Sequence, residues 1–515
     1  MWPFKAKAPK SSRAYAAARV DRLTADWISS TTSQDAESRL SIRILRDRSR
    51  QLERDNDYIG AALRLIENNV IGRGINFQAQ VKMQRGSKLN NDINDAIEYA
   101  FEKWARKGSC HTGGTLSFKD IERLVIRSIA RDGDVLVRMI KRPFGKSKVP
   151  FALELIEADQ LDDMMNQVAK DGQNEIRMGV ERDSWGRPVA YHIREGHPGD
   201  TFGMSQSNTS LRRRIPADEI IHLFVSNRIG QTRGIPWFHT AMVSLKHLNG
   251  YQEATIVKAR AEAAQMGFIK TPAGEMPNDG QQNGDYVQEF SPGTIRKLND
   301  GEDIVVPNMG NSVGNYDPFV RSVLRGISSG IGQSYESISK DYSQSNFSSS
   351  RLALADVRDN WKALQRWIVE QFHQPVFEAW LDMAVLSGEL KLPAYETKPE
   401  AYQCIKWKPR GWSYIDPQAE IRANKEAIRS GMTTLTDVVS ELGYDIEEVF
   451  QQRKRELELA EEMDLIFDTD PAVMSTAGQA QVMPVEDEAA DDTAEEEVSK
   501  PDPAQSKTDP MMAED

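Results

Sequence analysis

Apolar and polar positions follow two periods along the chain, and the longest helical pattern lies within residues 319–386. One helical face is marked by Phe319, Val323, Ile327, Ile331 and Tyr335. This spacing predicts a helix over residues 319–339, followed by an almost uncharged polar loop over residues 340–350. The apolar pattern resumes at Arg351, with Ser349 or Ser350 as a cap, and predicts a second helix to Leu386. At ~1.5 Å per residue this helix would be about 50 Å long, with a kink at Pro375.

Residues 31–233 combine helical periodicity with short alternating segments. A helical face over residues 59–70 ends at Gly72 and Gly74, and a strand is predicted over residues 75–81. Ser117 and Asp120 have the spacing of a capping box for a helix over residues 121–130, which follows a helix over residues 98–107. Further strands are predicted over residues 135–140, 151–156, 175–180, 188–193 and 219–224. The mixture predicts an α+β domain.

The segment 240–264 contains no Pro and only one Gly, which predicts a long helix that begins after Pro236. Its second half is rich in small residues, which let helices approach closely. From the pattern alone, an ordinary core helix and a helix that packs against other copies stay equally open. Residues 267–313 then change to short strands, predicted over residues 267–270, 293–298 and 303–306, around a polar loop at 271–285.

The two ends of the chain are predicted to be mobile. Residues 1–30 form an arm rich in Ala and Ser, and the chain after Asp468 is acidic and poor in aromatic residues, which is typical of disorder. Before that tail, residues 389–415 carry Trp407 and Trp412 in an extended stretch. Two more helices are predicted over residues 420–430 and 445–462.

Composition indicates a soluble protein of several domains. The 515 residues allow about three or four domains, and 39% hydrophobic residues suffice for a packed core. We expect no membrane span, since no apolar run approaches the ~18 residues that one needs, and no signal peptide. Cys110 and Cys404 are the only cysteines, which argues against a disulfide framework or a multi-cysteine zinc site and suits a reducing cytoplasm.

Charge is unevenly distributed. Residues 471–515 hold 12 acidic residues against Lys500 and Lys507, a net charge of −10, so the other 470 residues account for only −2 of the total of −12. Residues 1–54 carry 12 basic against 6 acidic residues, among them Arg43, Arg46, Arg48, Arg50 and Arg54. This basic segment is consistent either with a solvated, partly frayed helix or with an arm that contacts nucleic acid or a neighbouring protein.

The apparent catalytic motifs do not favour an enzyme. Residues 326–330 fit the G-x-S-x-G pattern, but their flanks are helical, whereas a nucleophile elbow follows an apolar strand. The pair Cys110 and His111 could suggest a thiol or metal site, yet the other histidines are scattered without ligand spacing. The sequence also lacks a phosphate-binding G-x-x-x-x-G-K-[ST] loop. We expect no catalytic residues, no cofactor and no metal, and any motor activity must reside in another protein.

Four long stretches in order resemble the lambda-type portal proteins of tailed phages. They are "DNDYIGAALRLIENNVIG", "ARDGDVLVRMIKR…FALELIEADQL", the segment from "IPADEIIHLFVSN" to "EAAQMGFI", and "NFSSSRLALADVRDNWKALQRWIVEQFHQPVFEAWLDMAVLSGEL". The resemblance covers roughly residues 30–465.

The resemblance implies a portal fold with named parts. After a flexible basic arm (1–30) come the wing (31–233), a stem helix (234–266), a small α/β clip (267–313) and a second stem helix (314–339). The tunnel loop (340–350) then leads into a long helix and the rest of the wing (351–415). A helical crown (416–468) and a disordered acidic tail (469–515) end the chain.

The resemblance also implies a function. Portal proteins of this family form a dodecameric ring at one capsid vertex, in the virion and, during assembly, in the host cytoplasm. A separate terminase pumps double-stranded DNA in through the ring, and the DNA leaves through it at infection. The implied partners are other copies of the chain, DNA, the terminase large subunit, major capsid and scaffold proteins, and head-completion or connector proteins. An oligomeric head-tail adaptor or scaffold that does not conduct DNA is the alternative.

Two groups of residues are the candidate sites under this resemblance. The tunnel loop would contact DNA through Lys340, Tyr342, Ser343, Gln344, Ser345, Asn346, Ser348, Ser349 and Arg351. The clip would bind partner proteins through Asn278, Asp279, Gln281, Gln282, Asn283 and Asp285. A loop of Ser, Gln and Asn makes weak, exchangeable hydrogen bonds to phosphates, so it suits sliding better than gripping. We expect Asp341 to offset part of the charge of Lys340.

Overall fold

A computed structural model describes most of the chain between residues 29 and 465. The described ranges are 29–82, 89–170, 172–200, 211–263, 268–270, 303–305, 316–344, 346–412, 416–444 and 446–463, together with a few isolated positions. The chain divides into two compact units, residues 1–445 and 446–515. Most of the arm 1–30 and all of the tail 469–515 lie outside the described residues.

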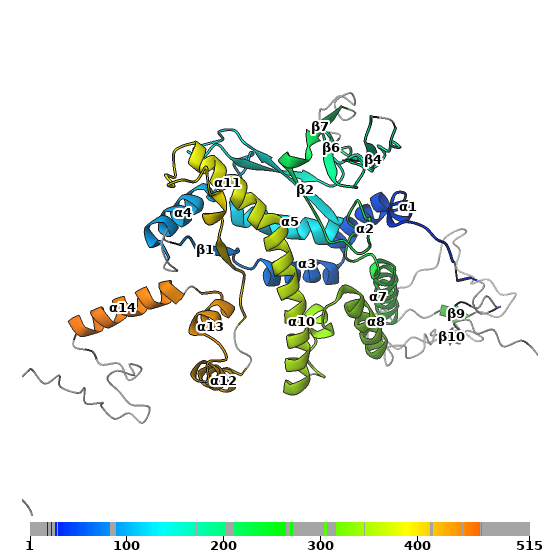
Figure 1. Ribbon diagram of the computed structural model, residues 1–515. Helices are drawn as coiled ribbons and strands as arrows, with labels where there is room; N and C mark the ends of the chain where they lie inside the picture. Colours follow the sequence, from blue (N-terminus) through cyan, green and yellow to red (C-terminus); the bar gives the residue numbers. More distant parts are fainter. Residues whose placement is uncertain are drawn as a thin grey trace, which may run out of the picture. The chain divides into compact units, whose positions relative to one another are not determined.

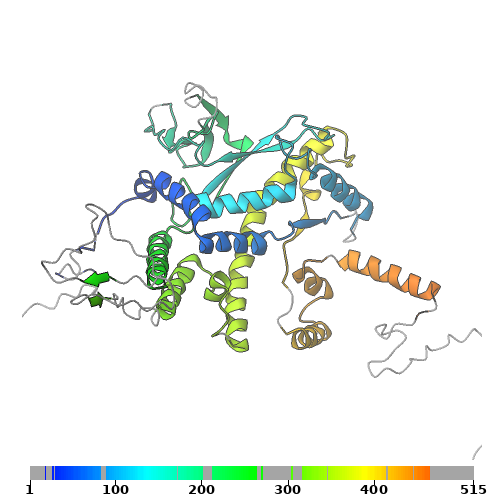
Figure 2. The ribbon, with the colours of Figure 1, turned by 180° about the vertical axis from the view of Figure 1, so that it is seen from behind.

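A three-stranded antiparallel sheet forms the centre of the first unit (Figure 1). Its middle strand β2 (Asp134–Ile140) pairs with β3 (Ala152–Glu157) and β8 (Ile220–Phe224). Helix α5 (Phe118–Asp132) packs against β2, and helices α2 (Ile42–Asp55) and α3 (Asp57–Val70) lie beside α5 (Figure 2). The predicted capping box of α5 is present, because Ser117 and Asp120 each accept a hydrogen bond from the other's backbone amide. The predicted mixture of helices and sheets is confirmed.

A second antiparallel sheet has the strand order β4-β5-β6-β7. It consists of β4 (Glu175–Arg177), β5 (Val180–Arg182), β6 (Pro188–Arg194) and β7 (Arg212–Pro216). Alternation along β2 builds two cores, since Val135 and Val137 pack with the helices while Leu136 packs with residues of the second sheet. The single strand predicted over residues 175–180 is wrong, because Met178 and Gly179 both have positive φ (46° and 84°) and turn the chain into a hairpin.

An aromatic cluster lies in the core that the helices of this unit share. It contains Phe77, Phe101, Trp104, Phe118, Phe377 and Trp380, whose rings pack at centroid distances between 4.9 and 6.2 Å. These rings come from β1 (Asn76–Ala79), α4 (Asn91–Trp104), α5 and α11 (Gln374–Leu386). Strand β1 pairs with β11 (Ile405–Lys408) within the stretch predicted as extended, so residues far apart in the sequence share one core.

The long helix predicted after residue 350 exists but is not one regular rod. It consists of α10 (Phe347–Ile368), one π-helical segment η4 (Val369–His373), and α11. Pro375 lies in the first turn of α11, directly after the π-helical segment. A π-helical segment interrupts the α-helix just before Pro375, whereas the predicted kink at Pro375 stays a prediction.

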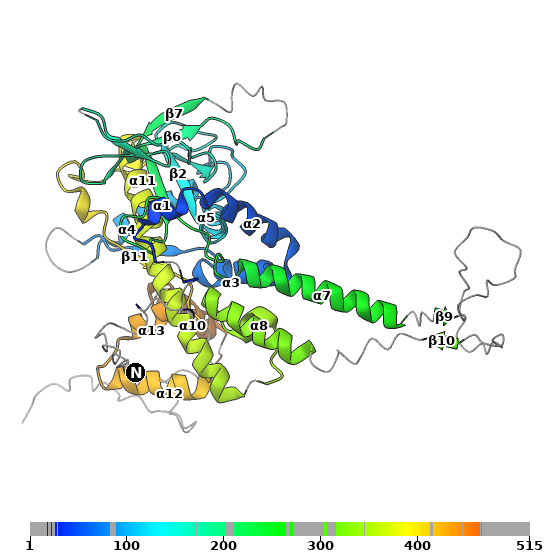
Figure 3. The same ribbon diagram turned by 90° about the vertical axis from the view of Figure 1, so that its right-hand side faces the viewer.

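Helices α7 (Met242–Ala263) and α8 (Tyr316–Ile331) lie beside each other (Figure 3). The first half of α7 buries Met242, Leu245 and Leu248. In the second half Ile256 and Val257 are 53% and 57% exposed, so this chain alone leaves that part of α7 uncovered. Strands β9 (Phe268–Lys270) and β10 (Asp303–Val305) pair antiparallel, as two of the predicted short strands, while the predicted strand 293–298 lies outside the described residues.

The remaining elements are short, apart from α12 and α14. They include α1 (Gln34–Ser38), the 3-10 turns η2 (Ala217–Glu219) and η5 (Pro399–Ala401), α12 (Pro417–Arg429), α13 (Leu435–Glu441) and, in the second unit, α14 (Ile446–Glu462). Helices α12 and α14 confirm predictions, whereas α13 was not predicted. Among the described residues, no helix combines the length and the apolar character that a membrane crossing needs.

Buried ion pairs and hydrogen bonds join α2, the central sheet and the segment that precedes α7. Arg233 is fully buried and donates to Asp134 and to the carbonyl oxygen of Ala158. Arg46 contacts Asp134 (3.7 Å) and Asp159 (2.6 Å) and is 1% exposed. Neither interpretation of the basic N-terminal segment is correct for Arg46, because it is an internal ion-pair partner rather than a solvated or nucleic-acid-binding residue.

A close backbone crossing lies beside these ion pairs. Gly133 has φ of 96° between α5 and β2, and a Cβ built on Gly234 would lie 2.0 Å from the Gly133 carbonyl oxygen. Only glycine fits both positions. The crossing fixes where the chain leaves the sheets to enter α7.

Candidate nucleic-acid interface

The helix predicted over residues 319–339 is interrupted before the loop. Helix α8 ends at Ile331, Gly332 takes a left-handed conformation (φ 75°), and α9 (Tyr335–Ser339) follows. Ser334 caps α9 by accepting a hydrogen bond from the Ser337 amide at 3.2 Å. The left-handed glycine and the new cap are the physical reasons why one continuous helix is wrong here.

The loop is shorter than predicted. It runs from Lys340 (φ 59°) to Asn346, whose carbonyl oxygen accepts the first hydrogen bond of α10 from the Ser350 amide at 3.0 Å. Ser348, Ser349 and Arg351 therefore belong to the first turns of α10 and not to the loop. Ser345 lies outside the described residues.

The described loop residues are polar and accessible. Tyr342 is 59% exposed, and Lys340, Ser343, Gln344 and Asn346 are also exposed. From Tyr342 to Asn346 the sequence holds no charged side chain. The structure thus brings most of the candidate loop residues together on one short, open segment.

Asp341 attaches the beginning of the loop to the helices. Its carboxylate accepts hydrogen bonds from the Tyr335 hydroxyl (2.9 Å) and the Ser343 amide (3.0 Å), and it pairs with Arg321 at 3.3 Å. The hydrogen bonds of Ser343, followed by that of Tyr335 and the charge of Arg321, lower the pKa of Asp341 to about 2. The ion-pair partner of Asp341 is Arg321, and the expected offset of the Lys340 charge stays a prediction.

The candidate clip residues Asn278, Asp279, Gln281, Gln282, Asn283 and Asp285 all lie outside the described residues. Strands β9 and β10 flank them in sequence, with Lys270 opposite Asp303. The partner-binding site therefore remains a prediction.

The apparent catalytic motifs have structural explanations. Ser328 lies within α8 and is 1% exposed, so the G-x-S-x-G pattern forms no nucleophile elbow. The Cys110 thiol is buried, and burial raises its pKa to about 12, which keeps it protonated.

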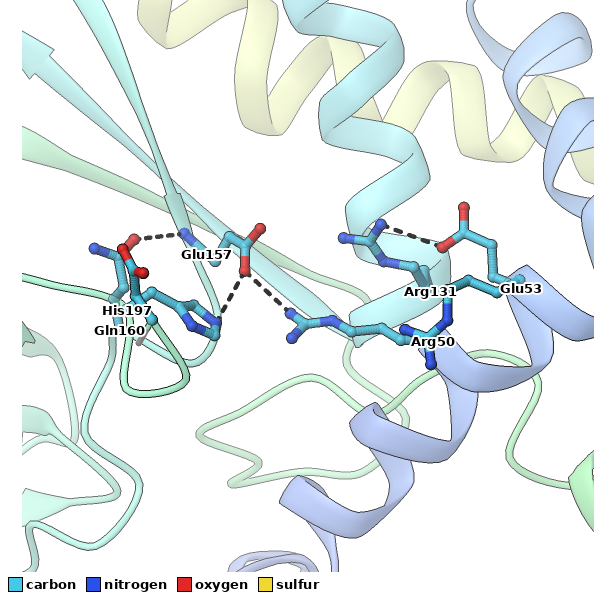
Figure 4. A pocket seen from close by; sticks show the side chains of 8 residues that line it. Arg50, Glu53, Arg131, Glu157, Gln160 and His197 are labelled. Atoms are coloured by element: carbon cyan, nitrogen blue, oxygen red, sulfur yellow. Dashed lines mark hydrogen bonds and ion pairs between the residues drawn. The ribbon is translucent and has the colours of Figure 1, made fainter. Parts of the chain in front are cut away.

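A charged pocket of about 620 Å³ was not predicted (Figure 4). Its lining includes Arg50, Glu53, Arg131, Glu157 and His197. His197 lies 3.3 Å from Glu157 and 3.6 Å from Asp159. These three side chains are of the types that bind metal ions, and each offers one ligand atom. His197 lies about forty positions after Glu157 and Asp159, so the sequence showed no recognisable spacing of metal ligands.

Arg50 already supplies the cation in this pocket. Its guanidinium contacts Asp159 at 2.5 Å, Glu157 at 3.5 Å and Asp132 at 2.8 Å. Arg46 pairs with Asp159 as well. Because these guanidinium groups neutralise the carboxylates that a metal would use, the geometry favours an internal ion-pair cluster over a metal centre.

Comparisons with known proteins agree on one family. A sequence model described as "Phage portal protein, lambda family" matches residues 20–365. A "Probable portal protein" of Halomonas phage phiHAP-1 is 32% identical over 462 residues, covering 87% of this chain and 86% of the relative. "Portal protein B" of Escherichia phage lambda is 22% identical over 444 residues, covering 79% of this chain and 82% of the relative.

A solved structure titled "Neck of native GTA particle computed with C12 symmetry" is also similar, with a TM-score of 0.38 and 15% identity. The alignment covers 77% of this chain and 93% of that chain. Since the family model spans well over half of the sequence and the Halomonas phage relative is similar along most of its length, the chain belongs to the lambda family of phage portal proteins.

Proposed function

We propose that this chain forms a ring-shaped channel at one vertex of the capsid, dodecameric as in its family. DNA is pumped in through the channel by a terminase and leaves through it at infection. Membership of the portal family supports this role. The role is mechanical rather than catalytic, so the packaging motor is a different protein.

In this proposal the described elements take the parts of a portal. Residues 31–233 and 351–415 form the wing, α7 and α8 with α9 form the stem, and residues 267–313 form the clip. Residues 340–346 form the tunnel loop, which is four residues shorter than the predicted loop 340–350 because α10 starts at Phe347. Residues 416–468 form the crown, with α12, α13 and α14 as its helices.

The observation that carries the ring proposal is the uncovered half of α7. Beyond Leu248 no described side chain of this helix is fully buried, although Ile256 and Val257 are apolar. Phe319 on the neighbouring α8 is also 48% exposed. Adjacent copies in a ring would remove these side chains from water, so oligomerisation would contribute to stability.

The composition of the loop supports a channel that lets DNA slide. Dense Lys or Arg would release counterions from DNA and hold it tightly. The exposed hydroxyl and amide groups of Ser343, Gln344 and Asn346 offer exchangeable hydrogen bonds instead. We assign the docking of terminase, and later of head-completion or connector proteins, to the clip; the wing and crown would face capsid and scaffold proteins.

Electron microscopy of the purified full-length protein, viewed along its axis, tests this function together with native mass measurement. A closed ring with an axial hole wide enough for duplex DNA is expected. The double variant Ile256→Glu and Val257→Glu should remain folded but fail to close the ring, whereas Val168→Glu, at an exposed apolar position in the wing, should not affect closure. A stable wild-type monomer at micromolar concentration would contradict the ring, and a ring without a continuous hole would favour an adaptor.

A further inference from the structure

Arg321 is the charged side chain that connects α8 to the loop. Its guanidinium lies 3.0 Å from Asp317 and 3.3 Å from Asp341, and it donates to the Ser343 hydroxyl at 3.3 Å. The side chain is 23% exposed. A guanidinium in this position is within reach of solvent ligands, yet two carboxylates already neutralise it.

The charges around the loop balance. Residues 316–344 carry three cations (Arg321, Arg325 and Lys340) and three carboxylates (Asp317, Glu336 and Asp341), so their sum is zero. Arg325 lies 5.5 Å from the ring centroid of Tyr335, and Tyr335 donates its hydroxyl hydrogen bond to Asp341. The uncharged stretch from Tyr342 to Asn346 therefore follows a segment of zero net charge in which Arg321 pairs with Asp317 and Asp341.

The donors around Asp341 are of the kind that bind phosphate oxygens. A guanidinium, a backbone amide and a hydroxyl converge on its carboxylate, and the same three groups are common phosphate ligands in protein–DNA contacts. The carboxylate thus occupies the place that a DNA phosphate would need in order to reach Arg321.

We propose that Arg321 is a phosphate-contact residue shielded by Asp341, which acts as an internal competitor for the DNA backbone. This inference rests on the proposed channel function. When a DNA phosphate approaches, Arg321 breaks its ion pair with Asp341 and binds the phosphate instead. The beginning of the loop is then released from α8. One ion pair replaces another, so contact with DNA gains little net free energy and reverses as the DNA moves on.

The two carboxylates on Arg321 provide a matched test. Asp317→Asn and Asp341→Asn remove the same charge from the same arginine, but only Asp341 attaches the loop. Binding of duplex DNA by the assembled wild-type and variant rings would be measured between about 50 and about 200 mM salt, with hydrogen exchange of the loop amides measured without DNA.

Asp341→Asn should accelerate exchange at the Ser343 amide and steepen the salt dependence of DNA binding. Each arginine that newly contacts a phosphate adds about 0.9 to the magnitude of the slope of log affinity against log salt concentration. Over that salt range this is about 3.5-fold more loss of affinity. Asp317→Asn should leave exchange near wild type and change the slope less. Adding Arg321→Gln to Asp341→Asn should remove the gain in slope.

Equal effects of the two single variants on both readouts would overturn the shielding role, because only net charge would then matter. If the salt dependence of Asp341→Asn stays steeper than that of wild type after Arg321→Gln is added, Arg321 is not the phosphate-contact residue. If Ser343→Lys rings also failed to bind DNA, the channel contact itself, and with it the proposed function, would be wrong.

Discussion

Arg233 and Asp134 form an ion pair in which neither side chain is exposed to solvent. Arg233 lies nine positions before the first residue of α7, and Asp134 opens the central strand β2. Arg233 also donates hydrogen bonds to the carbonyl oxygens of Leu161 and Met178. The pair therefore fastens the segment that leads to α7 to both sheets.

Removing Arg233 should be strongly destabilising. Arg233→Met leaves Asp134 as a buried charge with fewer donors, which costs about 3–5 kcal/mol of the free energy of unfolding. Arg228→Met, five positions earlier, breaks an exposed pair with Glu37 and should cost less than about 1 kcal/mol. Denaturant unfolding followed by tryptophan fluorescence, at one protein concentration, would measure both. Similar costs for the two variants would show that burial of the pair is unimportant.

Stability should fall in two steps as pH decreases. Burial lowers the pKa of His222, against the effect of its hydrogen bond to Asp134, so the folded state resists a proton that unfolded histidine accepts below about pH 6.5. Burial alone would raise the pKa of Asp159, but Arg46 and Arg50 lower it to about 2. Its stabilising effect is therefore present above about pH 3.9 and is lost as pH falls towards 2.

Thermal unfolding midpoints between pH 8 and pH 3 would show these steps. The variant His222→Gln should weaken the fall that begins near neutral pH and keep the one at acidic pH. A wild-type midpoint that stays constant down to pH 4 would contradict the assigned role of His222.

Adding charge to the loop region should impede movement of DNA. Replacement of Ser343, Ser345 and Ser348 by Lys adds three charges per copy, so DNA binding becomes steeply dependent on salt. Slower packaging or poor ejection is expected, partly relieved by salt in a purified packaging assay, with normal ring assembly. Lys at Ser184, Gln418 and Met432, which are exposed outside the loop, gives the same charge change as a control. Normal packaging by the loop variant would indicate that the loop does not face DNA.

Shortening the predicted clip should separate assembly from docking. Deletion of residues 278–284 should leave ring formation intact but impair packaging or connector attachment. Deletion of residues 201–207, an equally long segment before β7, is the matched control. Phage yield and attachment of terminase would be measured, and equal yields from the two deletions would argue against a docking role.

The sequence predicted elements wherever local chemistry decides the structure. The capping box of Ser117 and Asp120 located α5, and alternation from Val135 to Ile140 located β2. In contrast, β7 begins with three arginines and resembles a loop, because Arg212 and Arg214 find Asp162 and Glu181 only after the sheet has formed. Arg46 was likewise unpredictable as a core residue, since its partners Asp134 and Asp159 are distant in sequence.

The position of the polar loop was predicted from the sequence, but its details were not. The polar composition located the loop, whereas its end depended on where α10 starts, and serines are acceptable both in a loop and in a first helical turn. Asp341 stands next to Lys340 in the sequence, but the fold turns it towards Arg321, which lies one helix earlier. Contacts of this kind depend on tertiary structure and have no local signal.

The antiparallel pair of β1 and β11 has a consequence for synthesis of the chain. Asn76 lies opposite Lys408, so a ribosome must make more than three hundred further residues before β1 can meet its partner. Until then Phe77 lacks Trp407 and Phe377, two of the rings that it packs against. The nascent chain consequently carries an unpaired strand and exposed aromatic surface for most of translation, a period in which chaperone binding would protect it from aggregation.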